Sequence, residues 1–320
     1  MTTAPGLTEA RRPGSRDDPV VVFCAVGTLT ESLRARFPDV VVVDISGGVP
    51  ADVEGEVLFG GMGQPSVDAM GHGVHWVQSI GTGIDHLAPE ILAAGVLTSA
   101  RGASAVAISE YVITVMASFA RNFPDSWIHE PPEHWNYQPA VTLAGATVAL
   151  FGFGGIAQRV ARIALALEMS VVALRRTNAP SPVPGVRMAG SFAELVAEAD
   201  HLVLAAPATE ETRHVVNAAS LAQVKPGLHL VNIARGSLVD QDALRTALDD
   251  GRVARASLDV TDPEPLPAGH WLFQHPRVFL TPHSSWSGPP PLSGSFEIFC
   301  DNLTRYLAGQ PLQFVVHDGY

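Results

Sequence analysis

The sequence predicts an α/β protein built from two doubly wound parallel-sheet domains. Short apolar runs alternate with helical patterns along almost the whole chain, which is the pattern of strands that pair in parallel with helices on both faces of the sheet. Near the middle, a stretch rich in proline and tryptophan interrupts the alternation. The chain of 320 residues is long enough for two domains of about 100 to 200 residues each.

The first half of the chain predicts one complete α/β unit. Its expected strands are 20–26, 40–44, 56–60, 76–80 and 96–99, and its expected helices are 29–36, 66–70 and 87–94. The longest helical pattern, 104–121, leads into Pro124, Pro131 and Pro132, which a helix cannot cross. We therefore expect the chain to pass to a second domain here. The predicted division is a disordered tail at 1–19, a first, discontinuous domain at 20–113 and 289–320, and a second domain at 114–288.

The second unit begins with an expected strand, 147–151, that ends in glycines before an amphipathic pattern at 158–167. A Gly-x-Gly-x-x-Ala turn between strand and helix is typical of dinucleotide sites. Gly152 would form the tight turn, Gly154 would let a pyrophosphate approach the backbone, and Ala157 would let the helix pack closely. The phosphates would lie over the first N–H groups of the helix. A glycine-rich turn without a ligand is the alternative. The candidate cofactor residues of this turn are Gly152, Phe153, Gly154, Gly155 and Ile156.

The next expected strand, 170–174, ends at Arg175, Arg176 and Thr177. Many NAD-binding proteins carry an acidic residue here, which binds the ribose 2′-hydroxyl. A carboxylate would repel a 2′-phosphate, whereas guanidinium groups and a hydroxyl can bind it. We therefore expect NADP(H) to be preferred over NAD(H), with an exposed basic loop as the alternative.

Composition excludes several classes of partner. The net charge of −12 argues against nucleic acid and against an anionic membrane surface. Apolar runs fall short of the roughly 18 residues of a membrane span, and the start of the chain lacks the apolar core of a signal peptide. We therefore expect a cytoplasmic protein. Cys24 and Cys300 are too few for a disulfide framework or a metal cluster, so buried free thiols and no metal site are expected.

Three charged residues each follow an apolar run of the second unit: Arg235, Glu264 and His283. Ligands of open α/β sheets bind just beyond the carboxyl ends of the strands, where these side chains could act together. Taken singly, each has an ordinary explanation as a surface side chain.

Taken together, these residues resemble the D-isomer specific 2-hydroxyacid dehydrogenase family in order and spacing. The resemblance extends over most of the chain after residue 20, through 78–85, 109–112, the glycine-rich turn, 207–212 and the closing helix. It implies a Rossmann cofactor domain inserted into a flavodoxin-like substrate domain. It also implies an oxidoreductase that interconverts small 2-keto acids and D-2-hydroxy acids.

The resemblance assigns a role to each residue. His283 would exchange a proton with the substrate, Glu264 would favour the protonated form of His283, and Arg235 would bind the substrate carboxylate and carbonyl. The substrate carboxylate would also contact backbone N–H groups of Ile80, Gly81, Thr82 and Gly83. Asp259 would accept a hydrogen bond from the nicotinamide amide. The other expected cofactor contacts are Pro207, Thr212, Ile233, Ala234, His283 and Ser285.

The first expectation is an NADPH-dependent glyoxylate or hydroxypyruvate reductase. The alternatives are a cofactor-sensing, corepressor-like binding protein and a phosphoglycerate dehydrogenase-like enzyme. We expect no regulatory domain after Tyr320, which disfavours the long, regulated phosphoglycerate dehydrogenases. The resemblance implies a homodimer formed through the cofactor domain and the stretch 127–137. Family members usually carry a small residue or glycine soon after the histidine, where this chain has Ser284, Ser285 and Trp286. The sequence leaves open whether Trp286 narrows the pocket or only packs, and what the Pro289–Pro291 run does.

Overall fold

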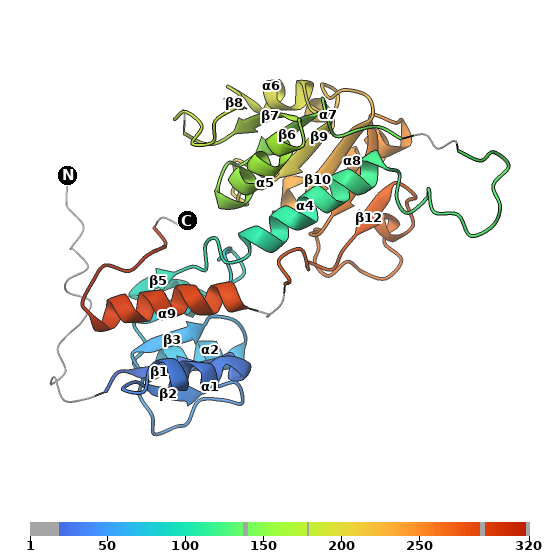
Figure 1. The fold of residues 1–320 in the computed structure, drawn as a ribbon. Helices are drawn as coiled ribbons and strands as arrows, with labels where there is room; N and C mark the ends of the chain where they lie inside the picture. The colour runs from blue at the N-terminus through green and yellow to red at the C-terminus, as the bar shows by residue number, and fades with distance from the viewer. Residues whose placement is uncertain (1–18, 137–139, 178, 289–291, 318–320) are drawn as a thin grey trace. The chain divides into compact units, whose positions relative to one another are not determined.

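The computed structural model describes residues 19–136, 140–177, 179–288 and 292–317. The chain divides into two compact units (Figure 1). The first contains the described residues up to Ala103 and those from Gly288 onward, and the second is Ser104–Ser287. Each unit is a parallel-sheet α/β domain, which confirms the predicted fold class. The expected tail at 1–19 and the Pro289–Pro291 run lie outside the described residues, apart from Pro19.

In the described part of the first unit, five parallel strands lie in the order β2-β1-β3-β4-β5. The strands are β1 (Val21–Cys24), β2 (Val41–Asp44), β3 (Val57–Gly60), β4 (Trp76–Ser79) and β5 (Val96–Thr98). The helices are α1 (Gly27–Arg36), α2 (Gln64–Ala69), the short 3-10 helix η2 (Met70–His72), α3 (Pro89–Leu92) and α9 (Ser293–Leu307). The five strands lie at the positions that the apolar runs predict.

Alternate residues of these strands form two separate cores. Val22 and Phe59 face α1 and α9, and Phe59 stacks on Phe299 of α9 with 4.4 Å between ring centroids. Phe23 and Leu58 point to the opposite face, beneath α2 and α3. Because both faces are covered, every residue of β3 and β4 is buried, as their continuous apolar runs indicate.

In the described part of the second unit, seven parallel strands lie in the order β12-β11-β10-β9-β6-β7-β8. The strands are β6 (Thr147–Phe151), β7 (Ser170–Leu174), β8 (Val186–Met188), β9 (His201–Leu204), β10 (Leu228–Asn232), β11 (Val253–Leu258) and β12 (Val278–Leu280). The helices are α4 (Ala105–Ala120), α5 (Gly155–Ala166), α6 (Phe192–Ala197), α7 (Ala218–Leu221), η3 (Gly236–Leu238), α8 (Gln241–Asp249) and η4 (Trp271–Phe273). The strand order reverses between β6 and β9, and ligands bind beyond such a switch point in open sheets. The edge strand β8 was not predicted, because its sequence Val-Arg-Met is not a continuous apolar run: Val186 and Met188 are partly buried and Arg187 is exposed.

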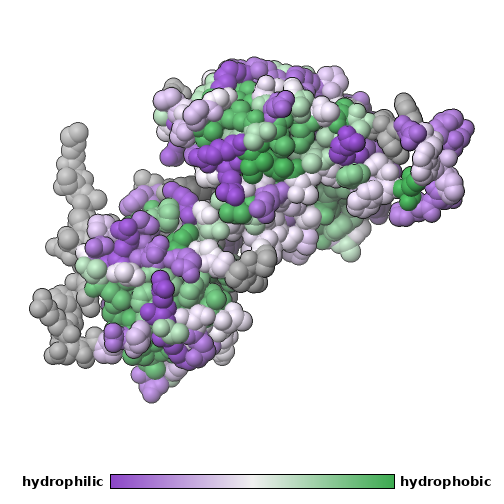
Figure 2. Space-filling model, viewed as in Figure 1, coloured by the Kyte–Doolittle hydropathy of each residue, from purple (hydrophilic) through white to green (hydrophobic). Residues whose placement is uncertain are grey.

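The unit boundary precedes α4, whereas the sequence prediction divides the chain at 113/114, inside this helix. Its apolar side packs with α5 and the sheet of the second unit through Ile108, Val112 and Met116. A continuous helix whose apolar side is buried in one core belongs to that core as a whole. Figure 2 shows hydrophilic and apolar residues mixed on the surface of each unit, with a large apolar patch on the second.

Two buried histidines lie near the amino ends of β9 and β10, at the edge of the sheet opposite the strand ends that carry the candidate site. The Nδ1 atoms of His201 and His229 are 3.0 Å apart, and Nε2 of His229 lies 3.0 Å from Oγ of Ser257. Burial lowers the pKa of His201 to about 4, and it lowers the pKa of His229 well below its usual value. Both rings are therefore neutral at neutral pH.

We expect the second unit to lose stability as the pH falls from 6.5 towards about 4. In this window both histidines are protonated in the unfolded chain but remain neutral in the folded protein. The free energy of unfolding therefore rises with pH, by up to about 1.4 kcal/mol per pH unit for each histidine. Urea unfolding monitored across the window measures this slope. His201→Asn should flatten it, while His134→Gln, at a side chain that is 76% exposed, should not. An unchanged slope in His201→Asn would contradict the prediction.

The described residues include no helix long and apolar enough to cross a membrane. Cys24 and Cys300 are buried free thiols, as the sequence predicts.

Candidate active site

The glycine-rich turn joins β6 to α5. Gly152 has φ +90°, and a Cβ atom there would lie 2.6 Å from the backbone nitrogen of Ala206, so the turn requires glycine. Gly154 precedes the first residue of α5, and no side chain caps the helix. A Cβ atom on Gly154 or Gly155 would meet nothing within 4 Å. Ala157 is buried where α5 packs on the sheet. The amino end of α5 therefore lies at an open backbone surface, which fits a phosphate group.

The basic segment after β7 also fits an anion. Arg175 is half-buried, and its Nη2 donates to the carbonyl oxygen of Pro180 at 2.9 Å. Its Nε is buried and has no hydrogen-bond partner among the described residues. Arg176 and Thr177 are exposed. Burying a donor without a hydrogen-bond partner costs free energy, and a phosphate oxygen would satisfy this one.

Two further predicted cofactor segments lie beyond the carboxyl ends of β9 and β10. Oγ1 of Thr212 donates to the carbonyl oxygen of Pro207 at 2.7 Å and accepts from the N–H of Thr209 at 2.8 Å, which closes the loop after β9. Ile233 and Ala234 follow β10 and are buried, so only a small part of each is accessible to a ligand.

The Arg235 turn is built from buried neighbours. Nδ2 of Asn232 donates to the carbonyl oxygen of Arg235 at 2.8 Å, and its Oδ1 accepts from the N–H of Ala234 at 3.0 Å. A Cβ atom on Gly236 would lie 2.0 Å from the carbonyl carbon of Thr261. The Arg-Gly pair therefore lets the arginine turn lie directly against the loop that carries Glu264. Sequence reasoning did not assign a role to Asn232 or Gly236.

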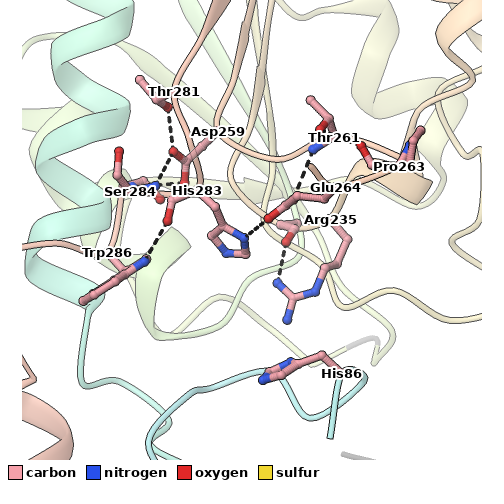
Figure 3. Close-up of polar contacts among 12 residues, drawn as sticks. His86, Arg235, Asp259, Thr261, Pro263, Glu264, Thr281, His283, Ser284 and Trp286 are labelled. Atoms are coloured by element: carbon pink, nitrogen blue, oxygen red, sulfur yellow. Dashed lines mark hydrogen bonds and ion pairs between the residues drawn. The ribbon is translucent and has the colours of Figure 1, made fainter. Parts of the chain in front are cut away.

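His283 and Glu264 form a direct pair (Figure 3). Nδ1 of His283 lies 2.6 Å from Oε1 of Glu264, and the two side chains are 41% and 39% exposed. The carboxylate accepts the Nδ1 proton, so Nε2 is the ring nitrogen that can exchange a proton with a ligand. The structure thus brings together the acid and the histidine that the sequence predicts to be partners, although 19 residues separate them.

The carboxylate of Asp259 binds the turn that carries His283 (Figure 3). Its Oδ1 accepts from Oγ1 of Thr281 at 2.6 Å and from the N–H of Ser284 at 2.8 Å. Its Oδ2 accepts from the N–H of Ser285 at 3.0 Å. A carboxylate offers about four acceptor positions, so these bonds leave room for the predicted contact with a nicotinamide amide. The turn-holding role of Asp259 was not predicted from sequence.

Tyr111 of α4 extends this network. Its Oη lies 2.9 Å from Oγ1 of Thr281. Because Thr281 donates its only hydroxyl proton to Asp259, Tyr111 is the donor in this contact. Burial raises the pKa of Tyr111, so the phenol keeps its proton at neutral pH. Sequence reasoning missed Tyr111 and Thr281 as site residues. The sequence offers one signal for Thr281: this hydroxyl residue stands between the apolar run 278–280 and His283.

The predicted carboxylate-binding loop, Ile80 to Gly83, belongs to the first unit and follows β4. The carbonyl oxygen of Ile80 accepts from Oγ of Ser295 in α9 at 2.7 Å, and that of Gly81 accepts from the N–H of Ala100 at 2.9 Å. Thr82 is exposed. The loop position thus depends on α9, which lies more than 200 residues away in the sequence.

Buried amides hold α9 beside this loop. Oε1 of Gln78 accepts from Oγ1 of Thr98 at 2.8 Å and from Nδ2 of Asn302 at 2.9 Å.

Among the described residues, no group of three or more His, Cys, Asp or Glu side chains is suited to hold a metal ion.

The chain matches a family model described as D-isomer specific 2-hydroxyacid dehydrogenase, NAD binding domain, over residues 113–285, which is more than half of its length. The chain belongs to this family. The resemblance predicted from the sequence motifs is therefore confirmed.

Individual relatives agree with this assignment. The chain is 36% identical over 193 residues to D-3-phosphoglycerate dehydrogenase 2, chloroplastic, from Arabidopsis thaliana, covering 58% of this chain and 30% of that protein. It is 37% identical over 167 residues to a glyoxylate reductase from Thermococcus gammatolerans, covering 52% and 50%. The chain spans half or less of the length of each of these two curated relatives. A solved structure is similar over the whole fold: a D-isomer specific 2-hydroxyacid dehydrogenase from Xanthobacter autotrophicus Py2 in complex with NADPH and MES, with a TM-score of 0.81, 26% identity, and coverage of 94% and 99%.

Proposed function

We propose that this dehydrogenase-family protein transfers a hydride from NADPH to a small 2-keto acid, giving a D-2-hydroxy acid, and catalyses the reverse reaction. The observation that carries the proposal is the His283–Glu264 pair, with 2.6 Å between Nδ1 and Oε1. It lies at the carboxyl edge of the same sheet whose β6 leads into the glycine-rich turn.

The residues of the second unit fit the cofactor. The glycine-rich turn and the amino end of α5 would hold the pyrophosphate, and the segment from Arg175 to Thr177 would hold a 2′-phosphate. Pro207, Thr212 and Ile233 would line the cofactor. Asp259 has an acceptor position for the nicotinamide amide. NADPH supplies the hydride when it is bound.

The charged side chains would then complete the reduction. The keto carbon gains a hydride, and negative charge develops on its oxygen, which requires a proton and a positive charge nearby. His283 would give the proton from Nε2, and Glu264 would stabilise the imidazolium through Nδ1. Arg235 and the backbone N–H groups of the 80–83 loop would bind the substrate carboxylate. In the reverse direction, neutral His283 would take the hydroxyl proton.

Glyoxylate and hydroxypyruvate are the first proposed substrates, supported by the similarity to a glyoxylate reductase. The similarity to a phosphoglycerate dehydrogenase keeps 3-phosphoglycerate chemistry as the second candidate. Oxidation of NADPH, followed by absorbance with a panel of 2-keto acids and with 3-phosphohydroxypyruvate, tests both. Turnover with the small keto acids supports the proposal. Tight NADPH binding without turnover of any of them would favour a cofactor-sensing protein instead.

We expect a lower KM for NADPH than for NADH. Arg175→Ala with Arg176→Ala should raise the KM for NADPH about 10- to 100-fold, because a hydrogen bond to a charged group contributes about 1.5–3 kcal/mol, and should leave the KM for NADH nearly unchanged. Arg187→Ala, which removes a surface ion pair with Glu194 in the same unit, is the matched control. A wild-type preference for NADH would overturn the cofactor proposal.

A homodimer is also proposed. In the stretch 127–137, which the sequence predicts to take part in the dimer, Trp127 is 61% exposed and Trp135 is 69% exposed. A second copy of the chain would cover this apolar surface. Tyr137 lies outside the described residues. Light scattering in solution measures the oligomeric state. A cytoplasmic location, and the absence of nucleic-acid or membrane partners, remain predictions from composition.

A further inference from the structure

Trp286 is bonded to the main chain of the proposed catalytic histidine. Its indole Nε1 donates to the carbonyl oxygen of His283 at 2.7 Å (Figure 3). The N–H of Ser287 donates to the carbonyl oxygen of Ser284 at 2.9 Å, which closes the turn that carries the indole back towards His283. The sequence left the role of Trp286 open, and this contact supplies a specific one.

His283 occupies a backbone conformation that needs support. Its φ is +52°, in the left-handed region that side chains other than glycine rarely adopt. Its N–H donates to the carbonyl oxygen of Asp259 at 2.9 Å, so the peptide before the histidine is held by the end of β11. The Trp286 bond holds the peptide after it. Because the backbone on both sides sets the direction of the imidazole, the two bonds together aim the ring at Glu264.

Trp286 does not belong to a hydrophobic core of the described residues. Trp286 is 40% exposed and packs in none of the hydrophobic clusters of the described residues. The histidine turn has a separate anchor in the Asp259 carboxylate, which binds the N–H groups of Ser284 and Ser285. The carboxylate of Asp259 therefore binds the residues after His283, whereas the indole of Trp286 binds the carbonyl oxygen of His283 itself.

We propose that Trp286 is a positioning residue that orients His283 for proton transfer through its indole N–H. The inference rests on the proposed function, since it assumes that His283 exchanges the proton. It assigns a purpose to a residue whose role the sequence leaves open.

Trp286→Phe tests the inference, because it keeps an aromatic ring and removes the donor. We expect kcat for keto-acid reduction to fall about 3- to 10-fold, the effect of losing one ordinary hydrogen bond, with the Kd for NADPH unchanged. The solvent deuterium isotope effect on kcat should rise, since proton transfer would limit turnover more. Loss of folded protein lowers kcat without changing that isotope effect. Trp271→Phe, the same exchange in the same unit away from His283, should behave as wild type.

Two further variants keep the test valid if Trp286→Phe folds poorly. Trp286→His keeps a ring N–H and should restore part of kcat and the wild-type isotope effect. In a His283→Ala background, Trp286→Phe should have no further effect on the residual rate, because the group that it orients is gone. Wild-type kcat and isotope effect in folded Trp286→Phe, or equal losses in both backgrounds, would overturn the inference. A wild-type protein without turnover would instead refute the proposed function.

Discussion

His283→Gln and His283→Ala are expected to lower kcat for 2-keto acid reduction by about 10²- to 10⁴-fold, the usual contribution of a general acid. The imidazole is held by Glu264 at 2.6 Å, and neither substituted side chain can donate a proton of suitable acidity in its place. The glycine-rich turn and the Arg175 segment are untouched, so the Kd for NADPH, measured by fluorescence titration, should remain close to wild type.

The control for this prediction is His134→Gln, at an exposed histidine of the same unit, which should keep full turnover. A His283 variant with near wild-type kcat would show that another group supplies the proton. A variant that lost NADPH binding as well would show that His283 supports the cofactor site rather than the chemical step alone.

Gly236→Ala is expected to lower both the melting temperature and the turnover. The added Cβ would lie 2.0 Å from the carbonyl carbon of Thr261 and 2.4 Å from the backbone nitrogen of Asp262, so main chain has to move. Overpacking of this kind costs about 1–3 kcal/mol or more. The displaced loop carries Glu264 and the altered turn carries Arg235, so the catalytic geometry should change with the fold. Thermal unfolding and steady-state kinetics measure the two effects.

Gly154→Ala is the matched comparison. Gly154 has φ −84°, which alanine adopts without strain, and its Cβ would meet nothing within 4 Å. The variant should keep the wild-type melting temperature but bind NADPH more weakly, since the new methyl group lies where a pyrophosphate would approach. A Gly236→Ala protein with the stability and turnover of the wild type would mean that the two loops do not need their close contact.

Several features of the fold and site could be predicted because their causes are local. Continuous apolar runs predict strands covered on both faces, and strands β1 to β7 lie where such runs occur. Gly152 could be assigned to a tight turn because its neighbours in sequence form the strand and the helix that it joins. Arg235, Glu264 and His283 could be placed near one sheet edge, because the carboxyl ends of parallel strands meet there.

Other features depend on contacts that local sequence does not contain. The pattern of 104–121 predicts a helix, but only its packing on α5 assigns the whole of α4 to the second unit. Asp259 could be matched to a cofactor contact, yet its bonds to Thr281, Ser284 and Ser285 arise from the parallel register of β11 and β12. Gly236 carries no sign in the sequence that Thr261 lies against it.

Sequence alone therefore predicts the fold class, the family and the identities of the charged residues at the strand ends. These follow from hydrophobic periodicity, from the steric needs of a strand-to-helix turn and from the order of motifs. The tertiary structure decides how His283 is held: Glu264 on its ring, Asp259 beneath its turn and Trp286 on its carbonyl oxygen. The bonds from Glu264 and Asp259 join the loops that follow β11 and β12, so they exist only once the sheet register has brought those loops together.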